Sequence, residues 1–81
     1  MRTKKLHWLQ LNSDILVTVC GDTIWIIRRN RAAGIAGRYD LTRTTKTDRI
    51  DVDGRELPLS DCKAIANDKY EEIYLGTENN N

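Results

Sequence analysis

The sequence predicts a small α+β domain, an antiparallel β-meander of four to six short strands with one C-terminal helix packed on the sheet. Short apolar, β-branched segments separated by turn-forming residues recur up to residue 57. Apolar residues at spacings of three and four then follow over residues 62–73. A chain of 81 residues forms one domain. We place that domain at residues 1–76 and expect a disordered C-terminal tail at 77–81.

The N-terminal half predicts three strands, at residues 6–11, 15–20 and 23–27. Asn12-Ser13-Asp14 is a cluster of turn formers between the first two. Gly21-Asp22 suits a two-residue type II′ turn between the second and third. This turn fixes which residues face each other: Val19 with Ile24, Val17 with Ile26, Thr18 with Trp25, and Leu16 with Ile27.

Both faces of this hairpin are apolar, which favours a central place in the sheet. The helix covers one face. The other face needs a further strand, a loop or a partner, and a chain of this size has little material left for it. Homodimerisation is one way to cover it.

The middle of the chain alternates loops and strands. Residues 28–38 are basic at both ends and small in the middle, which predicts an exposed loop. Residues 39–44 alternate, with Tyr39 and Leu41 inward, and residues 46–48 form a polar turn. Asp53-Gly54 is a strong hairpin signal between residues 50–52 and 55–57, and it pairs Ile50 with Leu57.

The C-terminal helix has a start, a buried face and a stop in the sequence. Pro58 ends the last strand, Ser60 is a good N-cap, and Asp61 suits the positive end of the helix dipole. Gly76 is the expected stop. One face carries the apolar residues Cys62, Ile65, Ala66, Tyr70 and Ile73.

The sequence contains little that supports catalysis or metal binding, so we expect that the protein is not an enzyme and binds no cofactor and no metal. His7 is the single histidine, and with Cys20 and Cys62 it matches no zinc spacing. The calcium-like run at residues 51–54 is explained by the hairpin turn. Two cysteines do not make a disulfide framework, so free thiols are expected, with a single bridge as the alternative.

The location expected from the sequence is the cytoplasm of the producing or host cell. No apolar run approaches the ~18 residues of a membrane span. The basic start of the chain is not followed by the continuous apolar segment of a signal peptide.

Charge is distributed unevenly along the chain. Residues 1–49 hold ten Lys/Arg and four Asp/Glu, whereas residues 50–81 hold three and eight. Because arginine suits bidentate contacts, we expect a partner-binding surface in the Arg-rich segment 28–49. A solvated edge, with arginines paired to the acidic helix face, is the alternative. The predicted binding residues are Arg28, Arg29, Arg31, Ile35, Arg38, Arg43, Lys46 and Arg49.

The function predicted from these features is a non-enzymatic binding or regulatory domain. It would dock on the acidic surface of a larger protein through the Arg-rich loop and strand. In size and in its strand-rich, one-helix style the chain resembles short accessory proteins of bacteriophages, including inhibitors of host defence. The alternative is nucleic-acid binding through the same surface, which the sequence pI near 7.8 disfavours.

Overall fold

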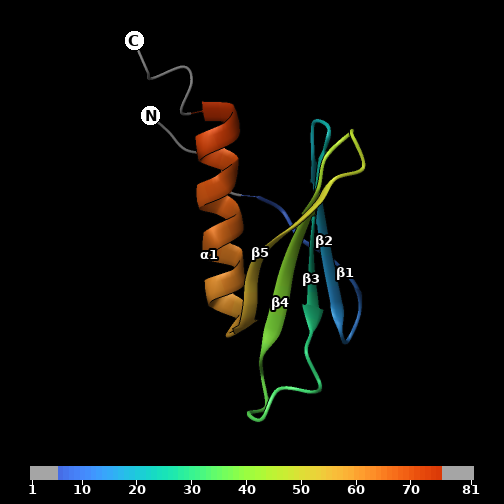
Figure 1. Ribbon diagram of the computed structural model, residues 1–81, viewed down its shortest axis with the longest axis vertical. Helices are drawn as coiled ribbons and strands as arrows, with labels where there is room; N and C mark the ends of the chain where they lie inside the picture. Colours follow the sequence, from blue (N-terminus) through green and yellow to red (C-terminus); the bar gives the residue numbers. More distant parts are fainter. Residues whose placement is uncertain (1–5, 76–81) are drawn as a thin grey trace.

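The computed structural model describes residues 6–75. It contains one antiparallel sheet of five strands in chain order, followed by a helix (Figure 1). The predicted fold class is therefore confirmed. The elements are β1 (Leu9–Asn12), β2 (Ile15–Cys20), β3 (Thr23–Arg29), β4 (Tyr39–Thr44), β5 (Ile50–Leu57), α1 (Leu59–Tyr70) and a π-helical segment (Glu71–Leu75) that continues α1.

The core lies between the sheet and α1, which covers one of its two faces (Figure 1). We call this the helix face and the opposite side of the sheet the open face. Alternation along the strands sends every second side chain of β2, β3 and β4 to the helix face. The buried apolar residues there are Leu16, Trp25, Ile27, Tyr39 and Leu41 from the sheet and Cys62, Ala66 and Tyr70 from α1.

The β2–β3 hairpin has the register expected from its turn. Val17 faces Ile26 and Val19 faces Ile24, and the two intervening pairs also match the prediction. Gly21 has φ +58°, which the first central position of a type II′ turn requires. Its position also places it close to Tyr74, whose hydroxyl would lie 3.1 Å from an added Cβ.

Strand β1 is shorter than predicted, because it begins at Leu9 and not at residue 6. The preceding segment leaves the sheet to pack against the core, and the amide of Leu6 donates to Asn67 Oδ1 of α1 at 3.1 Å. At the other end of β1, Asn12 Oδ1 accepts from the amide of Asp14 at 2.8 Å, which closes the expected turn. β1 therefore covers only residues 15–17 of β2.

The hairpin predicted at Asp53-Gly54 is wrong. Residues 50–57 form one continuous strand, β5, whose register against β4 slips twice. Gly54 lies against the helix face, where an added Cβ would come 2.8 Å from Leu57 Cδ1. Glycine thus serves a close approach beneath the helix here, and not a turn.

The start of α1 also differs from the expectation. Pro58 is the N-cap residue, and no side chain caps the helix, so Ser60 does not have the predicted role. Proline is well tolerated here because the first-turn amides have no helical acceptor, and its carbonyl accepts from the amides of Asp61 and Cys62. The predicted apolar stripe and the place of Asp61 in the first turn are confirmed. Gly76 and the tail at 77–81 lie outside the described residues.

Candidate protein-binding surfaces

The predicted Arg-rich surface is divided between the two ends of the sheet. Because β4 runs antiparallel to both neighbours, the β3–β4 loop and the β4–β5 turn emerge at opposite ends (Figure 1). Arg31, Ile35 and Arg38 lie at the loop end, and Lys46 and Arg49 lie at the turn end. The structure therefore separates the predicted residues into two groups.

At the loop end, two of the arginines bind one carboxylate. Arg29 Nε lies 3.0 Å and Arg31 Nη2 lies 2.7 Å from Asp14 Oδ1. The hydrogen bond from Arg31 is the main reason why the pKa of Asp14 falls below its ordinary value. Arg29 also lies over the ring of Tyr39, 5.2 Å from its centroid. Arg29 thus anchors the end of β3 to the β1–β2 turn.

Two guanidinium groups near the loop keep their charge free. Within residues 6–75, neither Arg28 nor Arg38 forms an ion pair. The tip residue Ile35 keeps 63% of its surface exposed, and Arg31 keeps 70% of its side chain exposed despite its bond to Asp14. A small hollow of about 170 Å³ lies between these side chains and the alanines of the loop.

At the turn end, the basic side chains are neutralised by neighbours. Arg43 contacts two carboxylates of β5, with its Nε 3.2 Å from Asp53 Oδ2 and its Nη2 3.4 Å from Asp51 Oδ2. Arg49 Nε lies 3.2 Å from Asp51 Oδ1, and Lys46 Nζ lies 3.9 Å from Asp22 Oδ2. All of these acidic partners come from strands and turns, not from α1.

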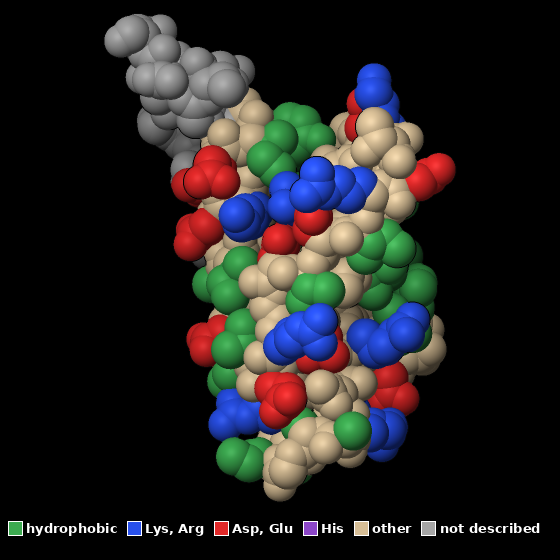
Figure 2. Space-filling view, viewed as in Figure 1, with side chains coloured by type: hydrophobic (Ala, Val, Ile, Leu, Met, Phe, Trp, Pro, Cys, Tyr) green, Lys and Arg blue, Asp and Glu red, His purple; other side chains and the backbone are tan. Residues whose placement is uncertain are grey.

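The space-filling view agrees with this pairing. Blue and red side chains lie next to one another over much of the visible surface, and no continuous basic stripe runs along this face (Figure 2). Arg43 is largely enclosed, with 18% of its side chain exposed, and its partner Asp53 is 5% exposed. Arg43 is therefore part of the folded framework.

The open face carries five of the seven large hydrophobic side chains that are exposed within residues 6–75. Register places Val19, Ile24, Thr44 and Ile50 in one row across the sheet, and Leu9, Val17, Ile26, Thr42 and Val52 in the next. Part of this surface is visible at the right of Figure 2. No described element covers it, and its large exposed side chains are Leu9, Val19, Ile24, Ile50 and Val52, with 37% to 67% of their surface in solvent. Of the covers considered from the sequence, neither a further strand nor a loop lies over this face within residues 6–75.

A groove runs along the middle of this face. It has a volume of about 340 Å³, its floor is formed by the small side chains Thr42 and Thr44 of β4, and Ile26 and Ile50 stand on either side. Arg28 and Asp40 occupy facing positions at its loop end. Asp40 accepts from Asn30 Nδ2 at 3.2 Å and from the amide of Glu56 at 2.9 Å.

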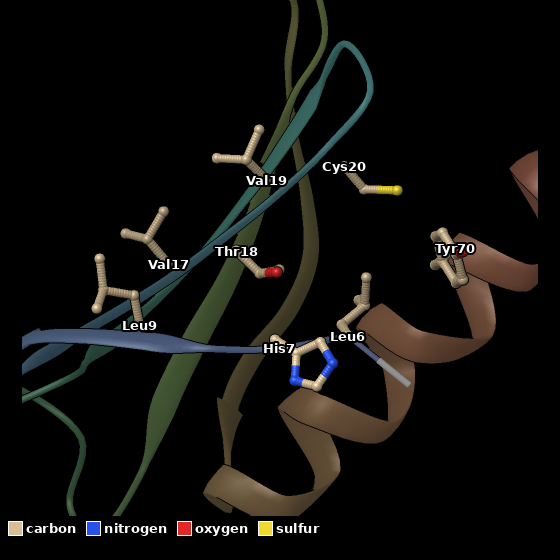
Figure 3. Close-up of a pocket in the computed structure, with 8 residues that line it drawn as sticks. All are labelled: Leu6, His7, Leu9, Val17, Thr18, Val19, Cys20 and Tyr70. Atoms are coloured by element: carbon tan, nitrogen blue, oxygen red, sulfur yellow. The ribbon is translucent and has the colours of Figure 1, made fainter. Parts of the chain in front are cut away.

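A second hollow lies beside the part of β2 that β1 leaves uncovered. It has a volume of about 330 Å³, and its lining includes the single histidine and one cysteine (Figure 3). The two side chains lie apart, so they do not form a nucleophile–base pair (Figure 3). The lining residues are Leu6, His7, Leu9, Val17, Thr18, Val19, Cys20 and Tyr70.

The remaining candidate chemistry is weak. Both cysteines are free thiols, and burial, with help from the Asp40 and Asp61 carboxylates, raises the pKa of Cys62 to about 11. Such a thiol stays protonated and unreactive at neutral pH. Across residues 6–75 no group of three His, Cys, Asp or Glu side chains could hold a metal ion.

Comparison with family models, curated proteins and solved structures finds no match to this chain. In the part of the chain that the structure describes, no helix has the length and apolar character to span a membrane.

Proposed function

We propose that this chain is a small protein-binding domain that docks on an acidic surface of a larger protein through the tip of the β3–β4 loop. The observation that carries the proposal is the combination in this loop of exposed Ile35 at the tip with exposed Arg31 and half-buried Arg38 near the base. An apolar anchor flanked by guanidinium groups is a favourable composition for a protein interface. A domain of this kind would act on its partner as an inhibitor or adaptor.

The proposal narrows the set of residues suggested by the sequence. Arg29 and Arg43 hold carboxylates of the fold, and Lys46 and Arg49 lie at the far end of the sheet. Arg28 projects from the open face and not from the loop. The docking residues proposed here are Arg31, Ile35 and Arg38.

Arg31 can exchange its present partner for one on another protein. Its bond to Asp14 is exposed, and exposed ion pairs contribute little to stability because solvent screens them. Asp14 would retain Arg29 after such an exchange. A carboxylate of the partner, placed beside an apolar patch that covers Ile35, therefore competes at little cost.

Nucleic-acid binding is the alternative use of the same charges, and it has less support. A nucleic-acid backbone is best bound by a continuous basic track, but the charges divide between two ends. Bases stack on exposed aromatic rings, and every described aromatic side chain is buried or half-buried: Trp8, Trp25, Tyr39, Tyr70 and Tyr74.

Charge reversal at the two ends tests the proposal with a matched control. A photo-cross-linking amino acid is placed at Ala36 in the loop, or at Thr47 in the opposite turn. The full chain is then expressed in the producing or host cell and irradiated. We expect a discrete heterologous adduct from position 36 alone. Arg31→Glu with Arg38→Glu should reduce its yield at least about tenfold, because like charges then face the partner. Lys46→Glu with Arg49→Glu, the same change in net charge, should leave the yield unchanged.

Three results would overturn the proposal. The first is the absence of a heterologous adduct at position 36, and the second is an equal loss with both pairs of substitutions. The third is steeply salt-dependent binding of a generic RNA or DNA oligonucleotide that Arg31→Glu with Arg38→Glu abolishes, which would establish the nucleic-acid alternative.

A further inference from the structure

We propose that the open face is covered by a second copy of this chain, in a symmetric sandwich whose two-fold axis runs parallel to the strands between β3 and β4. This inference concerns a different surface from the loop and does not depend on it. Sheets that pack face to face lie about 10 Å apart with their strands roughly aligned. The axis places β3 of one copy over β4 of the other, and β2 over β5.

Side-chain sizes on the two central strands fit this axis. Ile24 and Ile26 make β3 a ridge, while Thr44 and Thr42 opposite them make β4 the floor of the groove. Laying β3 over β4 of the second copy sets each ridge into the opposite groove. Large side chains facing small ones allow two layers to interdigitate, as in a protein core.

The outer strands complete the apolar contact. In the same register row, Val17 of β2 and Val52 of β5 lie at equal distances from the axis, and so do Val19 and Ile50 in the neighbouring row. The symmetry therefore places Val17 over Val52 of the second copy and Val19 over Ile50. On dimerisation these four side chains would leave solvent and contact their counterparts on the second copy.

The charges on the face select this axis over others. Because Arg28 and Asp40 are facing residues on β3 and β4, the axis between those strands puts Arg28 of each copy over Asp40 of the other. An axis along β3 would put Arg28 against Arg28. An axis across the strands would put the charged row against an apolar one, leaving charges buried without a partner.

Both members of this intermolecular pair can accept the contact. Arg28 is exposed and has no ion pair within residues 6–75. Asp40 accepts from Asn30 and from the amide of Glu56. A carboxylate has about four lone-pair positions, so it retains capacity for a guanidinium of the second copy.

The size of the face sets the expected affinity. The four strands that overlap, β2 to β5, at ~4.8 Å and about five residues at ~3.3 Å give on the order of 300 Å² of projected surface per copy. Side-chain relief adds accessible area, which brings the pair towards the lower end of specific interfaces, about 1,200 Å² in total. We therefore expect a dimer with a dissociation constant in the micromolar range.

Sedimentation velocity of the full chain between about 1 µM and about 1 mM measures this equilibrium. Val52→Lys should weaken dimerisation at least about tenfold, because it buries an ammonium group opposite Val17. Ala64→Lys introduces the same ammonium group at an exposed apolar residue of α1, on the other side of the sheet, and it should have no effect on this equilibrium.

A charge swap tests the axis itself. Arg28→Asp and Asp40→Arg should each weaken self-association at least about tenfold, since each places like charges in contact twice. An equimolar mixture of the two variants should recover the dimer, because both contacts between them are again of opposite sign. Melting temperatures of the two variants show whether each is folded.

A cross-link keeps the test independent of the fold of the Asp40 variant. In a Cys20→Ser background, a short bismaleimide should join a Val17→Cys chain to a Val52→Cys chain, and should join Val17→Cys chains to each other much less. The inference is overturned by a monomeric wild-type chain over the whole concentration range, by equal effects of Val52→Lys and Ala64→Lys, or by equal cross-linking of like and unlike chains.

Discussion

Replacing Arg43 by methionine should destabilise the domain by about 3–5 kcal/mol, because it leaves a buried carboxylate without its partner. Methionine keeps much of the length and apolar volume of the arginine side chain. The change therefore removes the guanidinium group and little else. Asp53 is 5% exposed, and the Arg43 Nε atom lies 3.2 Å from its Oδ2.

The magnitude follows from the burial of both groups. Arg43 is 18% exposed, so solvent screens this pair far less than it screens the pair of Arg49, whose side chain is 76% exposed. A domain of this length has a total stability of roughly 4–12 kcal/mol. A loss of about 3 kcal/mol would lower its melting temperature by roughly 12–24 °C.

Urea unfolding and thermal melting followed by circular dichroism measure the effect. Arg49→Met is the matched control, because Arg49 also contacts Asp51 but from an exposed position, and it should cost about 1 kcal/mol or less. Arg43→Met with Asp53→Asn should recover part of the loss, since no buried charge then remains unpaired. The reasoning fails if Arg43→Met behaves like Arg49→Met, or if Asp53→Asn brings no recovery.

Three further predictions concern single side chains. Gly54→Val should cost about 1–3 kcal/mol in urea unfolding, because Leu57 Cδ1, 2.8 Å from the new Cβ, must move while Ile65 and Leu41 lie within 3.8 Å and leave little room for the branched side chain; unchanged stability would contradict the close approach. The pKa of Cys62 is raised to about 11, so its contribution to stability is complete below the ordinary value of 9.0 and is lost as the pH rises through 11. Between about pH 8 and about pH 10.5 the wild type should therefore lose more stability than Cys62→Ala, and parallel losses would refute this. The pKa of Asp14 is lowered, so its contribution to stability is present above pH 3.8 and is lost as the pH falls through the lower folded value. In Arg31→Ala, NMR titration should show the pKa of Asp14 returning towards 3.8. An unchanged pKa would show that Arg31 is not the cause of the shift.

Most of the fold could be predicted from local signals. The strands at residues 15–20 and 39–44 and the register of the first hairpin follow from alternation and from the conformation of Gly21. The buried stripe of α1 follows from helical spacing. Each of these signals acts over a few neighbouring residues, so it can be recognised in the sequence without the tertiary structure.

The errors arose where a distant contact overrides a local preference. Asp53-Gly54 reads as a turn, but Arg43 on the neighbouring strand holds the Asp53 carboxylate, and the helix passes over the glycine. Similarly, Leu6 leaves the sheet because Asn67 of α1 binds its amide. Nothing in a local pattern reports such partners.

The candidate surfaces show the same division. The sequence identified an apolar second face that needs a cover, because alternation alone assigns side chains to the two faces of a hairpin. It could not show that Arg31 shares Asp14 with Arg29, or that Lys46 and Arg49 lie at the other end of the sheet. Pairing of charges depends on which strand ends meet, and that is a property of the assembled meander.

The two register slips in β5 have a consequence for how copies of this chain can associate. β5 is an outer strand of eight residues, and each slip inserts one unpaired residue, with Glu56 held at φ +53° beside the second. If a strand of another chain paired with the free edge of β5, its backbone donors and acceptors would not align with those of β5. That strand would also meet a run of charged side chains. Lateral growth into fibrils is thereby discouraged, so a high concentration of the protein can populate a closed pair without seeding an open-ended polymer.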